Sequence, residues 1–339
     1  MDTSAGLDQL RRMSARIGRD VSLVQGAGGN TSIKIGDVLW VKASGCRLSD
    51  ALERPTFVQL SLGAVRKQLA NGAPDERFES AILPALDGHG LRPSIETALH
   101  ALLPFPAIVH AHSVNCTTAS ILANGREWVR AALEQRFRWT WIPYRRPGLP
   151  LASAVANAWE STSAEVYILE NHGVIIGAAD CDAAAQILEE IERRISFVVR
   201  RPISRAQSVA PATTHYEATP QKFAYDAQMA AFLTEAARFP DQVVFLGGPV
   251  PRARNCADAD LIAERAKLHA DDPPPYVFVE GIGLLASRQR TRAAEPTMNA
   301  LHDIGTRIPP GEPVKGLTGA QVDELLGWEA EQHRRILSQ

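Results

Sequence analysis

The chain has 339 residues, of which 45% are hydrophobic and 22% are charged, so it is long enough for one large or two medium globular domains. Its formal net charge of −2 gives no support for a nucleic-acid-binding surface, which normally carries a clear basic excess. Residues 1–7 lack a basic segment followed by an apolar run, and no stretch approaches about 18 consecutive apolar residues, so we expect a cytoplasmic protein without a membrane or nucleic-acid partner.

The first predicted elements are a helix and a β-hairpin. Apolar residues recur at near-helical spacing over residues 7–17, and two short alternating runs, 31–35 and 38–41, are joined by a Gly-Asp pair that favours a tight turn. A glycine cluster at 26–29 precedes the hairpin, where a loop enters a strand. Such a loop leaves backbone N–H groups free to face an anion, although a flexible turn explains an isolated Gly-Gly pair more simply.

A second loop of small residues, Lys-Ala-Ser-Gly at 42–45, is followed by a predicted strand at 57–60 and a predicted helix at 62–70. The next helix has Ser94 as its predicted N-cap. This places Glu96 in the first turn, where the helix dipole favours a carboxylate. On spacing alone, helix stability accounts for this glutamate better than catalysis does. The histidines that follow change that balance.

A short apolar run at residues 108–113 contains two histidines one residue apart. Its β-branched content predicts a strand, and side chains at positions i and i+2 leave the same face, so His110 and His112 point at one spot. A third histidine, His172, lies in an Asn-His-Gly turn between two predicted strands. Three imidazole nitrogens with an open position are more typical of a catalytic zinc site than of a structural one.

The remaining elements of the first half alternate between helices and strands. We predict helices at 114–123, 150–159 and 182–198, and strands at 138–143, 165–169 and 174–176. The four cysteines show no C-x-x-C spacing, which is typical of free thiols in a reducing compartment (Cys46, Cys116, Cys181 and Cys256). A metal ion in this protein is therefore expected to be held by histidine and carboxylate side chains.

The two halves of the chain contain a weak internal sequence repeat. A shift of 110 residues lays 166–176 over 276–286, and each stretch is followed by an alanine-rich helical pattern. The histidine at position 172 becomes Ile282 in this alignment. We therefore predict that residues 215–339 form a degenerate second copy of the first lobe, without metal ligands of its own.

Three further patterns concern this second lobe. Residues 202–219 have the polar, proline-punctuated composition of a linker. A weaker parallel sets 243–247 against the histidine strand, which predicts a strand there. An amphipathic helix predicted at 318–337 is suited to docking on a lobe or on another subunit.

Five short motifs occur in order and with sensible gaps: Gly-Asn-Thr-Ser at 29–32, Lys-Ala-Ser-Gly at 42–45, Pro-Ser-Ile-Glu at 93–96, His-Ala-His-Ser at 110–113 and Asn-His-Gly at 171–173. As a set they resemble the class II aldolase/adducin family, whose members include the L-fuculose-phosphate and L-rhamnulose-phosphate aldolases. The resemblance covers roughly residues 7–200. It looks closest to the aldolase part of the bifunctional rhamnulose-phosphate aldolase/lactaldehyde dehydrogenase type, whose dehydrogenase part is absent here.

The resemblance implies a three-layer α/β/α sandwich around a mainly antiparallel central sheet. We assign this metal-binding catalytic domain to residues 1–205 and the degenerate lobe to residues 215–339. The family further implies a zinc ion, or another divalent metal, at His110, His112 and His172. Glu96 matches the catalytic acid/base, which can also bind the metal before substrate does.

Phosphate contacts carry over from the family to polar positions in three loops, and the glycine loop contributes to the same cradle. These positions are Gly29, Asn30, Ser44, Gly45 and Ser94. Ile95 departs from the family pattern, because small sugar-phosphate aldolases place a second hydroxyl residue there. The tyrosine that a neighbouring subunit contributes in the fuculose enzyme is unassigned. The family also implies a homo-oligomer, either a tetramer or a dimer that imitates a ring of four.

Together these residues predict a metal-dependent aldolase that cleaves a ketose phosphate or a related sugar derivative. Cleavage leaves an enediolate, whose charge a divalent ion stabilises while Glu96 moves the proton, and a partly dry site would raise the pKa of this glutamate. One alternative is a sugar-phosphate 4-epimerase or an oxo-acid phosphate decarboxylase on the same scaffold. Another is a non-catalytic, adducin-like interaction module, which the intact metal ligands disfavour.

Overall fold

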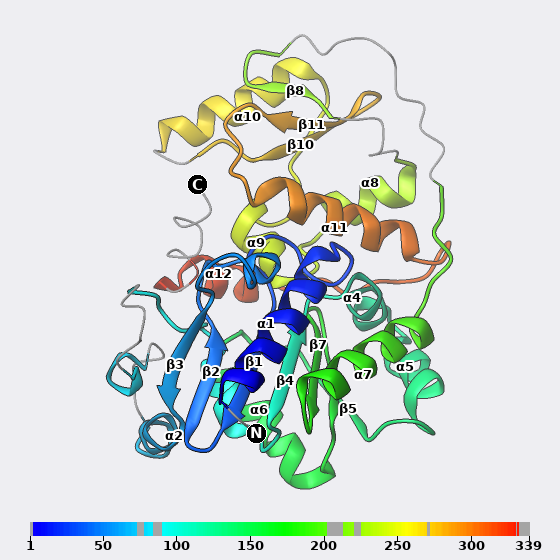
Figure 1. The fold of residues 1–339 in the computed structure, drawn as a ribbon. Helices are drawn as coiled ribbons and strands as arrows, with labels where there is room; N and C mark the ends of the chain where they lie inside the picture. The colour runs from blue at the N-terminus through cyan, green and yellow to red at the C-terminus, as the bar shows by residue number, and fades with distance from the viewer. Residues whose placement is uncertain are drawn as a thin grey trace. The chain divides into compact units, whose positions relative to one another are not determined.

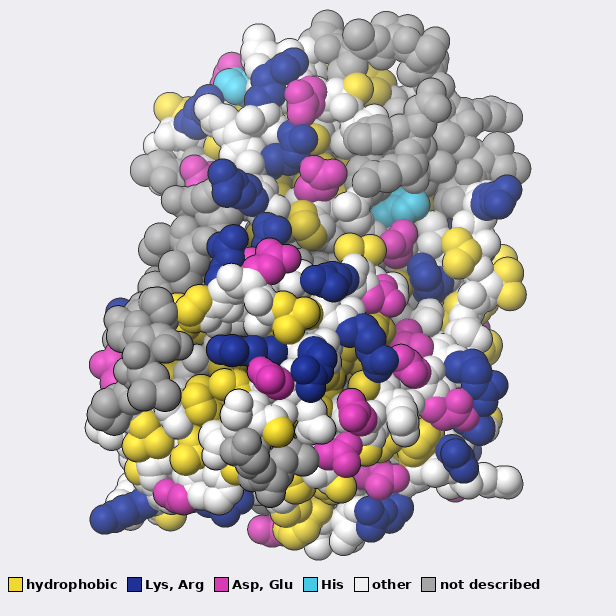
Figure 2. Space-filling model, in the orientation of Figure 1, with side chains coloured by type: hydrophobic (Ala, Val, Ile, Leu, Met, Phe, Trp, Pro, Cys, Tyr) yellow, Lys and Arg dark blue, Asp and Glu magenta, His cyan; other side chains and the backbone are white. Residues whose placement is uncertain are grey.

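The computed structural model describes residues 3–72, 78–83, 90–201, 213–219, 225–269, 272–329 and 331 (Figure 1). The chain divides into two compact units, Met1–Ser196 and Phe197–Gln339, each with a sheet of its own. No helix within those ranges has both the length and the apolar character needed to cross a lipid bilayer. Figure 2 shows basic and acidic side chains interspersed over one face, in keeping with the net charge of −2.

The first unit is built on a seven-stranded sheet. Its strands are β1 (Asn30–Ile35), β2 (Val38–Lys42), β3 (Phe57–Ser61), β4 (Ala107–Ala111), β5 (Trp139–Ile142), β6 (Val166–Leu169) and β7 (Gly173–Ala178). They lie in the order β3-β2-β1-β4-β7-β6-β5, so β4 is the central strand, and all five of its residues are buried. Every neighbouring pair is antiparallel except β5 and β6. The sheet is therefore mainly antiparallel, as predicted.

Helices cover both faces of this sheet, so the predicted α/β/α sandwich is confirmed (Figure 1). One face carries α1 (Thr3–Arg19), α4 (Val114–Ile121) and α7 (Cys181–Arg194), with α5 (Gly125–Leu133) packed on α4 and α7. The other face carries α2 (Leu62–Ala70), α3 (Thr97–Leu102) and α6 (Leu149–Thr162). Two short 3-10 helices are η1 (Leu48–Asp50) and η2 (Glu79–Ala81).

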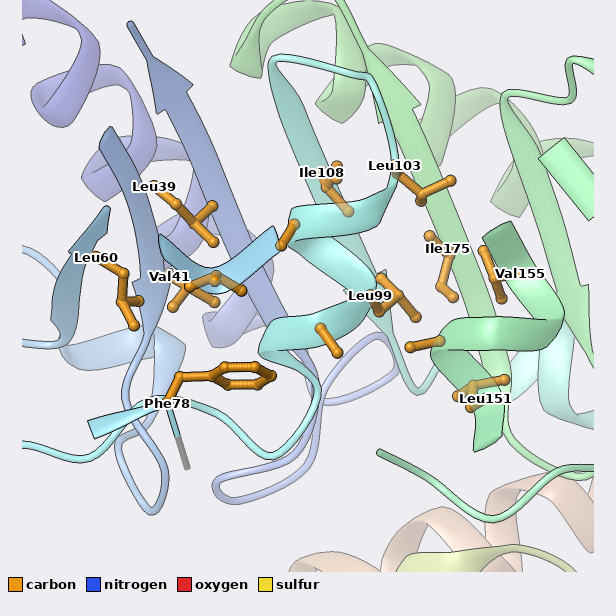
Figure 3. Packing of buried hydrophobic residues seen from close by; sticks show 14 of the residues in the cluster. Leu39, Val41, Leu60, Phe78, Leu99, Leu103, Ile108, Leu151, Val155 and Ile175 are labelled. Carbon is orange, nitrogen blue, oxygen red and sulfur yellow. The ribbon is translucent and has the colours of Figure 1, made fainter. Parts of the chain in front are cut away.

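The core beneath α2, α3 and α6 joins residues from distant parts of the chain (Figure 3). Leu39 of β2, Leu99 of α3, Val155 of α6 and Ile175 of β7 are all at most 1% exposed. Truncating such a side chain to alanine costs about 2–5 kcal/mol, because it removes buried contacts and leaves a cavity. This packing fixes α3, which follows Glu96 directly, against the sheet that carries the histidines.

The second unit has a four-stranded sheet made of β8 (Tyr216–Ala218), β9 (Arg252–Ala253), β10 (Tyr276–Val279) and β11 (Gly283–Ser287). Its order is β8-β11-β10-β9, with β9 and β10 parallel and the other pairs antiparallel. Its helices are α8 (Ala227–Thr234), α9 (Pro240–Leu246), α10 (Cys256–Leu268), α11 (Ala294–Arg307) and α12 (Gly319–Leu326).

The second sheet repeats the pairing pattern of β4-β7-β6-β5, with the same order and the same relative directions. The turn is repeated as well: Leu169 pairs with Gly173 on either side of the turn that contains His172, and Val279 pairs with Gly283 at positions 110 residues later. Ile282, at the histidine position, packs against the apolar core of the second unit. This topology supports a degenerate second copy, whereas the proposed limits of the two lobes stay a prediction.

Several local predictions need correction. The helix predicted to begin after Ser94 begins at Thr97, and the helix predicted to reach residue 198 ends at Arg194. Residues 243–247 are not a strand, because Pro240 begins a helix there that Gly247 ends in the left-handed conformation.

Other predictions fall partly outside the described ranges. Positions 202–212 of the predicted linker lie outside them, and residues 216–218 form β8. In the predicted C-terminal helix, residues 319–326 are helical, and position 330 and positions 332–339 are not among the described residues.

Candidate metal centre

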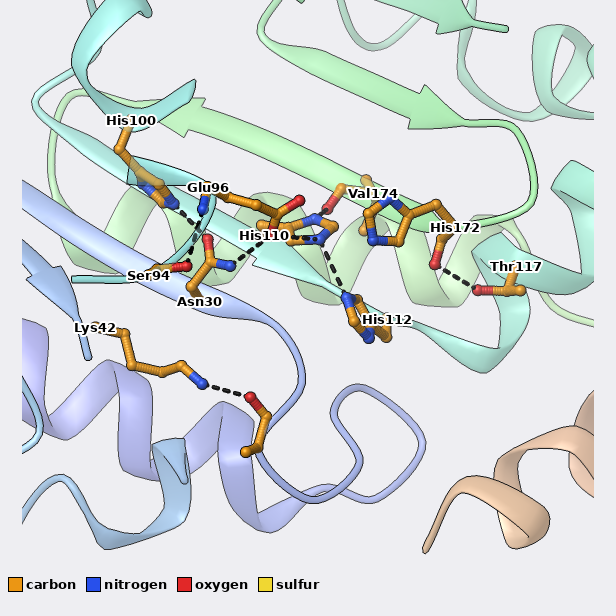
Figure 4. Close-up of polar contacts among 11 residues, drawn as sticks. Asn30, Lys42, Ser94, Glu96, His100, His110, His112, Thr117, His172 and Val174 are labelled. Atoms are coloured by element: carbon orange, nitrogen blue, oxygen red, sulfur yellow. Dashed lines mark hydrogen bonds and ion pairs between the residues drawn. The ribbon is translucent and has the colours of Figure 1, made fainter. Parts of the chain in front are cut away.

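The pairing of β4 with β7 brings the three predicted histidines together. His110 lies in β4 opposite Ile175, and His112 directly follows the strand. His172 lies in the turn between β6 and β7. One ring nitrogen from each histidine lies within 4.8 Å of the other two, and the Nε2 atoms of His110 and His112 are 3.2 Å apart (Figure 4).

The turn that carries His172 depends on close backbone packing. Asn171 adopts φ +55°, a left-handed conformation that asparagine tolerates better than most residues. A Cβ at Gly173 would lie 2.3 Å from the carbonyl oxygen of Ala111. The backbone of this turn can therefore approach the end of β4 this closely only with glycine at position 173. The carbonyl of His172 in turn accepts a hydrogen bond of 3.2 Å from the Thr117 hydroxyl.

His110 is held in one orientation. The residue is fully buried, and its Nδ1 lies 3.0 Å from the carbonyl oxygen of Val174. Because a carbonyl only accepts, a neutral ring carries its hydrogen on Nδ1 and keeps the lone pair of Nε2 for the other side of the ring. Histidines that bind metals commonly donate their second nitrogen in this way.

Glu96 lies beside the histidines and is 5% exposed. Its Oε2 is 3.4 Å from Nε2 of His110 and accepts a hydrogen bond of 2.7 Å from the Asn30 amide. Its Oε1 is buried and has no hydrogen-bond partner among the described residues. The carboxylate therefore has one oxygen that the protein holds and one that it leaves for another group.

The pKa of Glu96 moves in the opposite direction to the expectation. Burial alone would raise the pKa, but the neighbouring imidazoles of His110, His172 and His112 and the hydrogen bond from Asn30 lower it to about 2. The predicted increase is therefore wrong for this arrangement. The prediction considered burial alone and left out the effect of the three imidazoles and of the Asn30 amide.

Ser94 does not cap α3 as predicted. Glu96 occupies the N-cap position, and the Oγ of Ser94 accepts a hydrogen bond of 3.2 Å from the Glu96 N–H. The N–H of Ser94 donates to the carbonyl of Lys42, 3.0 Å away. Ser94 therefore anchors the backbone that presents Glu96 rather than the helix itself.

A buried polar chain beyond Glu96 escaped the sequence analysis. The Oδ1 of Asn30 contacts Nε2 of His100 (Figure 4). The Nδ1 of His100 lies 2.7 Å from the Ser32 hydroxyl. His100 follows Glu96 by four residues, and this spacing, which places two side chains on one face of a helix, was the available signal. Asn30 reaches the site because it pairs with His110 across β1 and β4.

The loops predicted to contact phosphate are joined to one another. The ammonium of Lys42 donates to the carbonyls of Ala27 and Cys46, at 2.6 and 2.8 Å, and so ties the glycine loop to the next one. Gly29 has φ +59°, and a Cβ there would lie 2.8 Å from the carbonyl of His110. The glycine loop thus packs directly on the histidine strand.

The predicted phosphate contacts differ in their access to solvent. Ser44 and Gly45 are partly exposed, whereas Gly29, Asn30 and Ser94 are buried. The side-chain amide of Asn30 is already engaged by Glu96 and His100. The amide of Asn30 therefore already has a hydrogen-bond partner on both its nitrogen and its oxygen.

The donor set fits a divalent cation. Imidazole nitrogens together with a carboxylate are the ligands that zinc and related metals take in open, catalytic sites. A buried acceptor left without a partner costs about 1–3 kcal/mol, and a cation would supply a partner for Oε1 of Glu96. The three histidines form a cluster able to hold such an ion.

Residues 9–199 match the protein family described as Class II Aldolase and Adducin N-terminal domain. The chain is 30% identical over 207 residues to the uncharacterized oxidoreductase YuxG of Bacillus subtilis (strain 168). This match covers 56% of the present chain and 30% of that protein, so the chain spans less than a third of the relative's length.

Similar solved structures include the N-terminal class II aldolase domain of a conserved protein from Thermoplasma acidophilum. It is 24% identical, with a TM-score of 0.48, and the match covers 57% of the present chain and 93% of that one. An L-fuculose 1-phosphate aldolase is 20% identical, with a TM-score of 0.42, over 57% of this chain and 85% of the aldolase.

Proposed function

Since the chain belongs to the class II aldolase and adducin N-terminal domain family, we propose that its first lobe, residues 1–205, is a metal-dependent aldolase acting on a ketose phosphate or a related sugar derivative. The observation that carries this proposal is the meeting of His110, His112 and His172 beside the buried carboxylate of Glu96. We assign the ion to zinc because of the ligand type.

Glu96 is the group that moves a proton in this proposal. The Nδ1 hydrogen of His110 is held by the Val174 carbonyl, and Oε2 of Glu96 is held by Asn30. Oε1 therefore accepts the proton from substrate and returns it, as a general base and then a general acid. A divalent ion held by the histidines would act as a Lewis acid toward the negative charge that develops on the substrate oxygens.

The loops around Gly29 and Ser44 are proposed to hold the anionic end of the substrate. Ser44 and Gly45 support this role because they are partly exposed and lie in a loop bonded to the one that leads to Glu96. Fixing the far end of the substrate keeps the reacting carbon in place, which lowers the entropic part of the barrier. Asn30 serves Glu96 instead of the phosphate in this assignment.

One preparation of the full chain tests the proposal. We expect stoichiometric divalent metal by elemental analysis, together with conversion of a ketose 1-phosphate into dihydroxyacetone phosphate and an aldehyde. A stereoisomer or carbon dioxide as the product would instead favour the epimerase or the decarboxylase. A folded preparation without metal or turnover would favour the adducin-like interaction module.

A further inference from the structure

The buried chain from Glu96 to Ser32 has a defined direction of hydrogen donation. A carboxylate accepts, so Asn30 turns its Nδ2 toward Glu96 and its Oδ1 toward His100. Because Oδ1 cannot donate, the hydrogen of this contact lies on Nε2 of His100. A neutral ring carries one hydrogen, so Nδ1 accepts from the Ser32 hydroxyl at 2.7 Å.

Burial leaves this chain of hydrogen bonds no alternative partners in solvent. Ser32 and His100 are fully buried and Asn30 is 3% exposed, so solvent cannot substitute for a missing partner. Burial, with Lys34 and His110 nearby, also holds the pKa of His100 well below its usual range, which keeps the ring neutral.

The amide of Asn30 has two orientations of nearly equal shape, and only one of them suits Glu96. In the flipped orientation Oδ1 would face Oε2, so that two acceptors would meet at the 2.7 Å distance now occupied by an N–H donor. A fixed Nε2–H donor on His100 disfavours that flip, because the flipped amide would set its own N–H group against the ring hydrogen.

We propose that His100 is a positioning residue that locks the amide of Asn30 and, through it, the carboxylate of Glu96, with Ser32 setting the ring tautomer. The inference rests on the proposed function, since it assumes that Glu96 transfers a proton. With the amide locked, Oε2 stays bonded to Asn30 and Oε1 stays turned to the reacting group. Without the lock, Glu96 loses its orientation while the metal ligands stay in place.

Two substitutions separate positioning from general stability. His100→Gln keeps a side-chain N–H that can donate to Asn30, whereas His100→Leu has a similar volume and no donor. Turnover is measured per bound metal ion as the exchange of a carbon-bound hydrogen of dihydroxyacetone phosphate with solvent deuterium. We expect His100→Leu to lower kcat at least about tenfold with KM and metal content little changed, and His100→Gln to restore most of the rate.

The outcomes are distinguishable. Absence of exchange in the wild-type enzyme would contradict the proposed function. Exchange at the wild-type rate in His100→Leu, or a rate in His100→Gln no better than in His100→Leu, would overturn only the role of His100.

A second measurement does not depend on whether a His100 variant folds. Nitrogen-15 NMR of the wild-type protein at neutral pH should show His100 as the neutral Nε2–H tautomer. Ser32→Ala, which removes the donor to Nδ1, should give a mixture of His100 tautomers. The same variant should also exchange the carbon-bound hydrogen of dihydroxyacetone phosphate with solvent deuterium more slowly than the wild type. An Nδ1–H tautomer or a charged ring in the wild-type protein would overturn the inference.

Discussion

Oε2 of Glu96 lies 3.4 Å from Nε2 of His110, and both atoms belong to side chains that solvent barely reaches. Since the hydrogen of a neutral His110 lies on the opposite nitrogen, the two atoms face each other as acceptors. Two acceptors at this distance repel unless a proton or a cation joins them. Substitutions on the two sides of this contact therefore test two different roles, that of Glu96 as a base and that of His110 as a metal ligand.

Glu96→Gln should keep the metal and lose most of the turnover. The amide has nearly the same shape as the carboxylate but cannot accept a proton, and general acid–base catalysis contributes about 10²–10⁴-fold. We expect kcat to fall by at least about 100-fold with metal content unchanged, measured on the same preparation. Turnover near the wild-type rate would contradict the assignment of Glu96 as a base.

His110→Ala should lose the metal itself. Its Nδ1 is bonded to the Val174 carbonyl and its Nε2 faces the other two histidines, so the substitution removes one of the three nitrogen ligands. Elemental analysis after dialysis checks this result. His269→Ala, which removes an exposed histidine of the second unit, is the matched control and should bind as much metal as the wild type does.

Gly173→Ala should destabilise the first unit by more than about 2 kcal/mol, because the new Cβ would lie 2.3 Å from the Ala111 carbonyl. Gly319→Ala is the control, since nothing lies within 4 Å of a Cβ built there, and it should change stability by less than about 0.5 kcal/mol. Urea unfolding measures both variants. Equal stabilities would show that β4 and β7 separate more easily than their packing implies.

Ile282→Ala tests the corresponding turn of the second unit. Ile282 is partly buried against the core, so its truncation should cost about 1–2 kcal/mol, which is less than for a fully buried isoleucine. Metal content should stay at the wild-type level because the turn carries no ligand. A loss of metal would mean that the second unit takes part in binding.

Asp226 predicts a pH dependence of stability. Burial alone would raise its pKa, but the Met229 N–H and the Arg200 guanidinium, each 2.7 Å away, lower it. A carboxylate with a lowered pKa stabilises the fold above its unfolded pKa of about 3.9, and this contribution is lost as the pH falls through the folded value.

The unfolding free energy of Asp226→Asn should therefore lie below that of the wild type by a constant amount near neutral pH. The gap should narrow below about pH 4, as the wild-type carboxyl is protonated. Urea unfolding at several pH values measures it. A gap that stays constant down to pH 3 would rule out this ion pair as its source.

Patterns within one segment predicted much of the first unit. The Gly-Asp turn joins β1 and β2 as expected, and the i, i+2 spacing of His110 and His112 brought their rings together. The partners of Glu96 were beyond such reasoning. Asn30 lies 66 residues before it in the chain and reaches it only through the pairing of β1 with β4.

The errors have physical causes too. The hydroxyl of Ser94 accepts from the N–H of Glu96, and the Ser94 carbonyl accepts from the N–H of Thr97, so residues 94–97 form a turn before the helix begins at Thr97. In 243–247 every residue except Gly247 is buried, so hydrophobic periodicity could not separate a helix from a strand. Pro240 and Gly247 carried the decisive signals.

β4 has three strands on either side of it and helices above and below. Amide hydrogens in such a strand exchange with solvent mostly through the rarest and largest openings of a domain. His110 is thus anchored to the part of the unit that opens least often, so an ion held by it would dissociate from a protein that is still folded.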